Sequence, residues 1–81
     1  MRKITIDILK LNDLKHTYLK DVFNFPDYYG HNLDAFYDLV SSMYYTDIYI
    51  LNFDQANTFS LKVINILNDI SLEYKNLLLF K

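Results

Sequence analysis

A stripe of acidic and hydroxyl-bearing side chains recurs at helical spacing in the middle of the chain, and its members are Asp34, Tyr37, Asp38 and Ser41. Positions i, i+3, i+4 and i+7 share one face of a helix. Carboxylates one turn apart repel each other, and only Asp34 lies near enough to the helix N-terminus for the helix dipole to compensate its charge. The stripe is either an ordinary solvated helix face or a surface that binds a cationic partner.

Tyrosines and a local excess of negative charge accompany the stripe. Tyr28 and Tyr29 immediately precede the helix, and large amphipathic rings around a few charges are typical of interface hot spots. The net charge is only −2, yet the segment between Lys20 and Lys62 contains six Asp and no Lys or Arg. Binding of nucleic acid through its phosphates requires a basic patch, so we expect no direct nucleic-acid partner.

Two rival chemistries are open to this sequence, catalysis and metal binding. The chain has no Cys and a single Gly, which excludes a thiol nucleophile, a Cys-based zinc site and a Gly-rich phosphate loop. We expect His16 to be a surface or hydrogen-bonded helix residue, whereas His31 could be a pH-sensitive contact, since histidine titrates near pH ~6.5. No nucleophile stands at a recognisable spacing from a base. The sequence therefore predicts no enzymatic activity and no cofactor.

The metal alternative rests on four carboxylates, which are Asp34, Asp38, Asp69 and Glu73. They could converge on a hard cation, which prefers oxygen ligands. However, the chain lacks an Asp-rich calcium loop, and paired i, i+4 carboxylates without a loop or a His are weak ligands. We therefore expect no metal site.

The elements that position these residues follow from periodicity and from capping residues. Ile4, Ile6 and Ile8 alternate as in a strand, and Asn12 or Asp13 can cap the helix that follows. Pro26 ends that helix, and Asn32 can cap the next one. The expected elements are a strand over 4–8, helices over 14–25 and 33–42, a strand over 48–53, a helix over 58–74 and a strand over 77–80.

This β-α-α-β-α-β order predicts an α/β fold in which helices pack on a small three-stranded parallel sheet. Leu77–Phe80 is apolar at every position, as expected of a strand that is buried on both faces. The length of 81 residues predicts a single domain, residues 1–81. No segment resembles a secretory signal or a membrane span, so we expect a cytoplasmic protein without a membrane partner.

One continuous run, Phe25–Val40, closely resembles the signature of the barstar family. The shared pattern is an apolar residue, Pro, an acid, Tyr-Tyr-Gly, any residue, Asn-Leu-Asp-Ala, a hydrophobic residue, an aromatic residue and Asp. Barstar-like proteins are intracellular inhibitors of secreted microbial ribonucleases, and their fold is a small parallel three-stranded sheet with helices. The resemblance thus implies an inhibitor of a secreted or toxin-type ribonuclease with a basic active site, bound in a 1:1 complex as an antitoxin or immunity protein would be.

The resemblance also implies roles for individual residues. Asp38 is similar to the family's central aspartate, which enters the ribonuclease active site where a substrate phosphate would bind, and Asp34 is similar to its neighbour one turn earlier. Tyr28 matches the loop aromatic that packs on the enzyme. The partner-binding residues expected in this way are Tyr28, Tyr29, Gly30, Asn32, Asp34, Tyr37, Asp38, Ser41, Asp69 and Glu73.

The sequence departs from the family pattern at three places. Ser42 and Met43 replace a Gly-Trp pair, His31 replaces an acidic residue, and the segment 52–57 is too short for the additional helix that the family usually carries. These departures indicate either a partner related to, but not the same as, the familiar ribonuclease, or a looser complex. The alternative is an acidic protein-interaction or hard-cation-binding module with no ribonuclease partner.

Overall fold

Three parallel strands form the centre of the fold. The computed structural model of the protein describes residues 2–81, in which the strands are β1 (Arg2–Asp7), β2 (Thr46–Leu51) and β3 (Leu77–Phe80). They lie in the order β1-β2-β3 and pair in parallel. The register sets Ile4 beside Ile48, so that β-branched side chains of neighbouring strands form one buried face. The expected three-stranded parallel sheet is confirmed.

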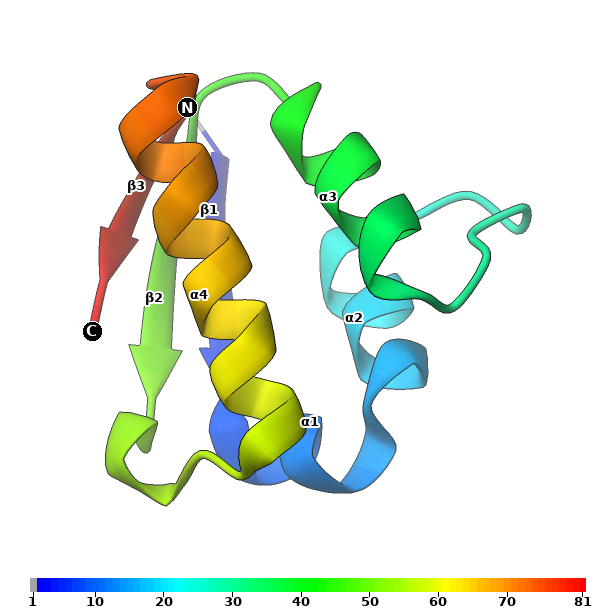
Figure 1. Ribbon diagram of the computed structural model, residues 1–81, viewed down its shortest axis with the longest axis vertical. Coiled ribbons are helices and arrows are strands. Elements are labelled where there is room, and N and C mark those ends of the chain that lie inside the picture. The colour runs from blue at the N-terminus through cyan, green and yellow to red at the C-terminus, as the bar shows by residue number, and fades with distance from the viewer. Residues whose placement is uncertain (1) are drawn as a thin grey trace.

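Helices cover this buried face. They are α1 (Ile8–Leu14), α2 (His16–Phe23), α3 (Leu33–Ser41) and α4 (Thr58–Glu73), with a short 3-10 helix η1 (Phe53–Gln55) before α4. Figure 1 shows α4 crossing in front of the sheet with α3 beside it. Each α-helix contributes side chains that are fully or almost fully buried, among them Leu11, Leu19, Phe36 and Leu67. None of the helices described over residues 2–81 is long and apolar enough to cross a membrane.

Asp and Asn side chains start three of the four α-helices. Asp7, Asn32 and Asn57 each accept a hydrogen bond from a backbone N–H in the first turn of α1, α3 and α4, which satisfies a donor that the helix itself leaves free. The predicted cap at Asn32 is confirmed, and α4 begins at residue 58 as expected. The predicted caps at Asn12 and Asp13 are wrong, because α1 begins directly after β1.

The predicted helix over 14–25 is in fact the second of two short helices. Ile8 belongs to α1 rather than to the first strand, and the backbone turns at Lys15, whose φ of 52° is left-handed. After α2, Asn24 also adopts the left-handed conformation and ends the helix two residues before Pro26. The order of elements is unchanged by this division.

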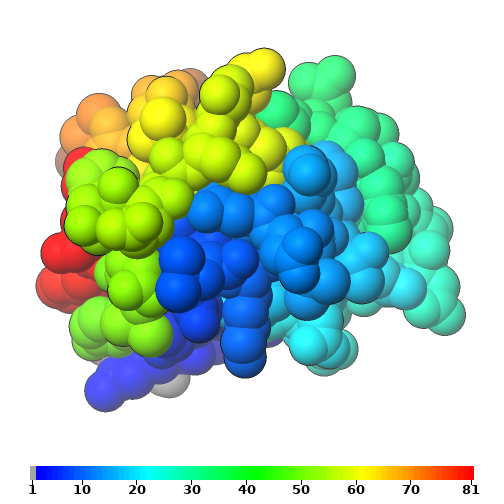
Figure 2. All heavy atoms as spheres, turned by 90° about the horizontal axis from the view of Figure 1, so that it is seen from below, coloured from blue at the N-terminus to red at the C-terminus, as the bar shows by residue number. Residues whose placement is uncertain are grey.

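Asn12 serves instead as a link between α1 and the start of α4. Its Nδ2 donates to Gln55 O at 2.9 Å, and its Oδ1 accepts from Asn57 N at 3.1 Å and from Ser60 Oγ at 2.6 Å. Figure 2 shows this end of the molecule, where the segment before α4 (yellow-green) lies against the first helix (blue). These contacts fix the position at which α4 begins.

The outer edges of the sheet differ from expectation. β3 pairs only with β2 and is an edge strand, in which Leu77 is buried while Leu78 is 57% exposed and Phe80 is 44% exposed. The expectation that Leu77–Phe80 is buried on both faces is therefore wrong, because the helices cover only one face. β2 also ends at Leu51, since Asn52 is left-handed and η1 follows.

Candidate functional site

Helix α3 presents two carboxylates to solvent from a firmly anchored backbone. Phe36 and Val40 are completely buried, whereas Asp34 and Asp38 are exposed on the other side of the helix. The Asn32 cap accepts from Ala35 N at 2.8 Å and fixes the first turn. The helix therefore holds both carboxylates at a defined spacing, as the sequence pattern predicts.

Helix α4 carries the second carboxylate pair near its C-terminal end. Asp69 and Glu73 are exposed, and the neighbouring Ile70 is fully buried against the core. Because α3 and α4 are in contact, the two pairs lie on adjacent helices. We refer to Asp34, Asp38, Asp69 and Glu73 as the acidic face.

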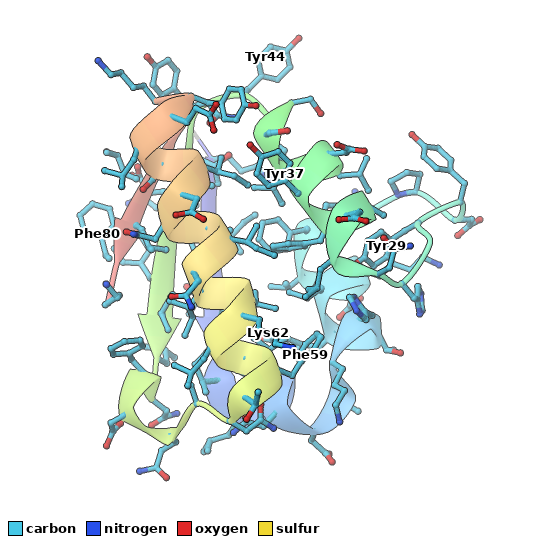
Figure 3. The ribbon with its side chains drawn as sticks, viewed as in Figure 1. Tyr29, Tyr37, Tyr44, Phe59, Lys62 and Phe80 are labelled. Atoms are coloured by element: carbon cyan, nitrogen blue, oxygen red, sulfur yellow. The ribbon has the colours of Figure 1, made fainter. Side chains whose placement is uncertain are left out.

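Tyr37 joins the two halves of the acidic face. Its Oη lies 3.2 Å from Glu73 Oε2 and 3.2 Å from Tyr74 Oη, which links α3 to the end of α4 (Figure 3). The hydrogen bond with Tyr74, burial and the charge of Glu73 together raise the pKa of Tyr37 well above its ordinary value of 10. The phenol therefore stays protonated and remains a donor to the Glu73 carboxylate. Tyr74 itself is 46% exposed.

No cation neutralises the acidic face from within. Among residues 2–81 the one ion pair joins Lys20 Nζ to Asp27 Oδ1 at 3.1 Å, away from α3 and α4. None of the four carboxylates is therefore ion-paired within the described residues. Unpaired carboxylates on one surface favour contact with an oppositely charged surface.

The four carboxylates do not form a metal centre. Within the part of the chain that the structure describes, no three Asp, Glu, His or Cys side chains lie close enough to hold one ion. The carboxylates are spread over two helices, which suits several separate cations on a partner better than a single bound metal ion. The geometry gives the hard-cation alternative no support.

The α2–α3 loop, residues 24–32, places three predicted site residues at the start of α3. Tyr28 is 79% exposed, and Gly30 and Asn32 are exposed as well. Asn32 Nδ2 donates to Gly30 O at 3.2 Å, and a Cβ atom at Gly30 would lie only 2.9 Å from that nitrogen. A side chain at this position would press on the Asn32 amide group, which would have to shift from its place in the helix cap.

Tyr29 and Ser41 occupy less accessible places than the other predicted residues. Tyr29 is only 4% exposed and its ring packs against Phe25, with 4.8 Å between the ring centroids. It supports the loop from inside and offers a partner almost no surface. Ser41 is half-buried, and its Oγ donates to the Asp38 carbonyl oxygen at 3.1 Å.

Two exposed tyrosines follow the end of α3 and are not among the predicted site residues. Tyr44 is 94% exposed and Tyr45 is 68% exposed. Together with Arg2, Leu39, Ser42 and Met43 they line an open hollow just beyond the helix. Sequence reasoning cannot separate a buried from an exposed tyrosine between a helix and a strand, because no periodicity applies there.

Comparisons with known proteins are consistent with this architecture. The sequence model of the family described as "Barstar (barnase inhibitor)" matches residues 1–76 of the chain. A Bacillus subtilis (strain 168) protein named "Putative ribonuclease inhibitor YrdF" is 41% identical over 63 residues, which cover 73% of this chain and 69% of that protein. The family match includes every residue of the acidic face.

Proposed function

The chain belongs to the barstar family, and from this membership and the geometry of the acidic face we propose that it is a ribonuclease inhibitor that blocks the active site of its target. The observation that carries the proposal is the set of four exposed carboxylates on two adjacent helices, none of them ion-paired within residues 2–81. A ribonuclease active site is built to bind RNA phosphates with Arg, Lys and His side chains. Carboxylates on the acidic face would take the place of those phosphates, and nothing in them can be cleaved.

The helical mounting supports inhibition better than a flexible acidic segment would. Interactions with charged groups are strong only when the geometry is fixed before binding, because ordering a flexible side chain or loop costs free energy. Phe36 and Val40 anchor α3, and Asn32 fixes its first turn. Asp38 would enter the active site, Asp34 would contact its rim, and Asp69 and Glu73 would bind outlying cations.

The proposed partner is a secreted or toxin-type ribonuclease with a basic active site, bound one to one. In this proposal the inhibitor acts in the cytoplasm, protecting the cell as an antitoxin or immunity protein, and has no catalytic activity of its own. The exposed Tyr28 would pack on the enzyme surface. Tyr44 beyond the end of α3 is free to extend the contact, where the family pattern has a Gly-Trp pair in place of Ser42 and Met43.

The decisive experiment titrates the protein into a ribonuclease produced by, or directed against, its source organism, with RNA cleavage and isothermal calorimetry as readouts. We expect 1:1 binding with a Kd in the nanomolar range or below and complete loss of cleavage. Asp38→Ala should weaken binding by at least about 2 kcal/mol, or roughly thirtyfold in Kd, as expected of a central hot-spot residue.

Asp54→Ala is the matched control, because it removes the same charge from an exposed site in η1, outside the acidic face. Binding that falls equally in both variants would mean that net charge, and not the position of Asp38, governs recognition. Heat from Ca²⁺ or Mg²⁺ titration at millimolar concentration, together with no ribonuclease binding, would favour the cation-binding alternative.

A further inference from the structure

Two histidines, a tyrosine and a phenylalanine pack together behind the α2–α3 loop. His16 belongs to α2, Tyr29 and His31 to the loop, and Phe59 to α4 (Tyr29 and Phe59 are labelled in Figure 3). The ring centroid of His16 lies 5.7 Å from that of Tyr29, 6.1 Å from that of His31 and 5.0 Å from that of Phe59. The ring of Tyr29 also lies 5.3 Å from that of His31. The loop is thus attached to two helices through this cluster.

One short hydrogen bond links His16 to Tyr29 inside the cluster. His16 Nδ1 and Tyr29 Oη are 2.7 Å apart, and among the described residues Tyr29 Oη has no other hydrogen-bond partner. Burial raises the pKa of Tyr29 to about 12, so its hydroxyl keeps its hydrogen. A neutral His16 can accept that hydrogen at Nδ1. A protonated His16 would instead donate from Nδ1 to Tyr29 Oη, and the hydroxyl hydrogen of nearly buried Tyr29 would then have no acceptor among the described residues.

We propose that His16 and His31 form a proton-sensitive clasp that positions the α2–α3 loop for partner binding, closed while both imidazoles are neutral and opened when both are protonated. The proposal rests on the proposed function, because the loop carries Tyr28 and the Asn32 cap of α3. His16 and His31 touch no partner in this scheme. They are positioning residues that act through Tyr29.

The stacked arrangement of the two imidazoles opposes double protonation. Their rings are inclined by only 29°, and no carboxylate in residues 2–81 lies within ion-pair distance of either ring. Burial, followed by the charge of His31, lowers the pKa of His16 below its ordinary value of 6.5. His31 also has a left-handed backbone, with φ of 51°, so little local preference holds it in place once repulsion begins.

Several charged side chains belong to the elements that surround the cluster. Around His16 they are Lys15 and Lys20; the loop adds Asp27, which is already paired with Lys20. The first turn of α3 adds Asp34, and α4 adds Lys62, one turn after Phe59 (Figure 3). Neither of these carboxylates forms an ion pair with an imidazole within residues 2–81, so no such pair offsets the repulsion between the two rings.

The direction of the effect follows from linkage. Because the folded protein binds a proton at His16 less readily than the unfolded chain, the loop's closed state is favoured above pH 6.5 and loses stability as the pH falls. The clasp would therefore open on acidification, and the inhibitor would release or miss its partner in acidified surroundings.

Amide hydrogen exchange on the free protein, followed by NMR, tests the clasp without any ribonuclease. The reporters are the Tyr29 amide, which donates to Pro26 O at 3.0 Å, and the Ala35 amide, which donates to Asn32 Oδ1 at 2.8 Å. The Tyr74 amide at the end of α4, bonded to Ile70 O, is the internal reference. Corrected for intrinsic exchange, protection of both reporters relative to Tyr74 should fall at least about tenfold between pH 7.5 and pH 5.0.

His31→Asn removes one of the two charges, and asparagine tolerates the left-handed backbone. In this variant the protection of the Tyr29 and Ala35 amides should change less than about threefold over the same range. Lys75→Asn is the matched control, since Lys75 is also exposed with φ of 56° but lies at the end of α4; it should behave as the wild type. Flat protection in the wild type, or an equal fall in His31→Asn, would overturn the clasp. If no ribonuclease binds at any pH, the proposed function fails, and the exchange data still decide whether the clasp exists.

Discussion

Asp38 lies on the exposed side of α3, one turn beyond Asp34, and no cation in residues 2–81 forms an ion pair with it. In an isolated helix such a like-charge pair at i, i+4 lowers stability, and the helix dipole offsets only the charge nearer the N-terminus. The folded protein therefore gains nothing from the Asp38 charge. A partner that places cations beside Asp38 would gain binding free energy from this charge. We therefore expect Asp38 to contribute to binding and not to stability.

Substitution of Asp38 tests whether its charge contributes to the stability of the fold. Asp38→Asn removes the charge with almost no change in shape and should leave the free energy of unfolding unchanged or raise it by about 0.2–0.5 kcal/mol. Urea unfolding followed by circular dichroism measures this change, with Asp54→Asn as the control for net charge. A loss of more than about 1 kcal/mol in Asp38→Asn would show that the carboxylate stabilises the fold and would contradict our interpretation.

Two adjacent tyrosines of the α2–α3 loop differ sharply in solvent exposure. Tyr28 is 79% exposed and Tyr29 is 4% exposed, although the two are neighbours of the same type in the same loop. The signature motif predicts a role for both and cannot distinguish a contact residue from an internal support. The difference arises because the Tyr29 hydroxyl reaches His16 on α2 and its ring packs against Phe25.

The elements of the site depend on one another through a few polar contacts. Asn32 caps α3 and donates to Gly30 O, so the geometry of the loop and the position of the first turn are coupled. Tyr37 couples α3 to α4 through Glu73 and Tyr74. Displacement of either contact would shift two carboxylates of the acidic face relative to the other two.

A double-mutant cycle measures the coupling between the loop and α3. Asn32→Ala should destabilise the protein by about 1 kcal/mol, the usual cost of a lost N-cap. Gly30→Ala should cost a similar amount, because its Cβ would lie 2.9 Å from Asn32 Nδ2 and displace the cap. The double variant should cost scarcely more than Asn32→Ala alone, since both substitutions remove one interaction. Full additivity in urea unfolding would mean that Gly30 is required for another reason.

For the molecule as a whole, folding brings two aspartates from the acidic stretch between Lys20 and Lys62 next to two carboxylates of α4. The net charge is only −2, but the exposed carboxylates of α3 and of the end of α4 lie on adjacent helices, and none of them is ion-paired within residues 2–81. A local excess of one charge raises the rate at which an oppositely charged protein is captured, and added salt screens it.

Ionic strength should consequently affect association far more than dissociation. Between about 0.01 M and 1 M salt the Debye length falls from about 30 Å to about 3 Å, and the association rate with the ribonuclease should drop at least about tenfold. The dissociation rate should change much less, because the close contacts are less screened. Stopped-flow mixing gives both rates. An association rate that is indifferent to salt would assign recognition to apolar contacts, such as those of Tyr28 and Tyr44.

Much of this protein is determined by short-range features of its sequence. Alternating isoleucines predict the first strand, Asn32 and Asn57 predict two helix starts, and the spacing of Asp34 and Asp38 predicts a shared exposed face. Each of these properties depends on residues no more than about four positions apart, where backbone geometry alone relates one side chain to the next. The same reasoning fails at Asp7, which caps α1, because the strand ends there rather than at Ile8.

Tertiary structure alone decided which distant residues meet. Tyr37 contacts Glu73 across 36 positions, His16 meets Tyr29 across 13, and Asn12 holds Ser60 across 48. It also decided that Leu77–Phe80 lies at the edge of the sheet with one face open. Local periodicity carries no information about these pairings, because they depend on which helix packs beside which strand once the whole core has been buried. The sequence alone identifies the acidic residues, but the contacts that hold them in place are determined only by the tertiary structure.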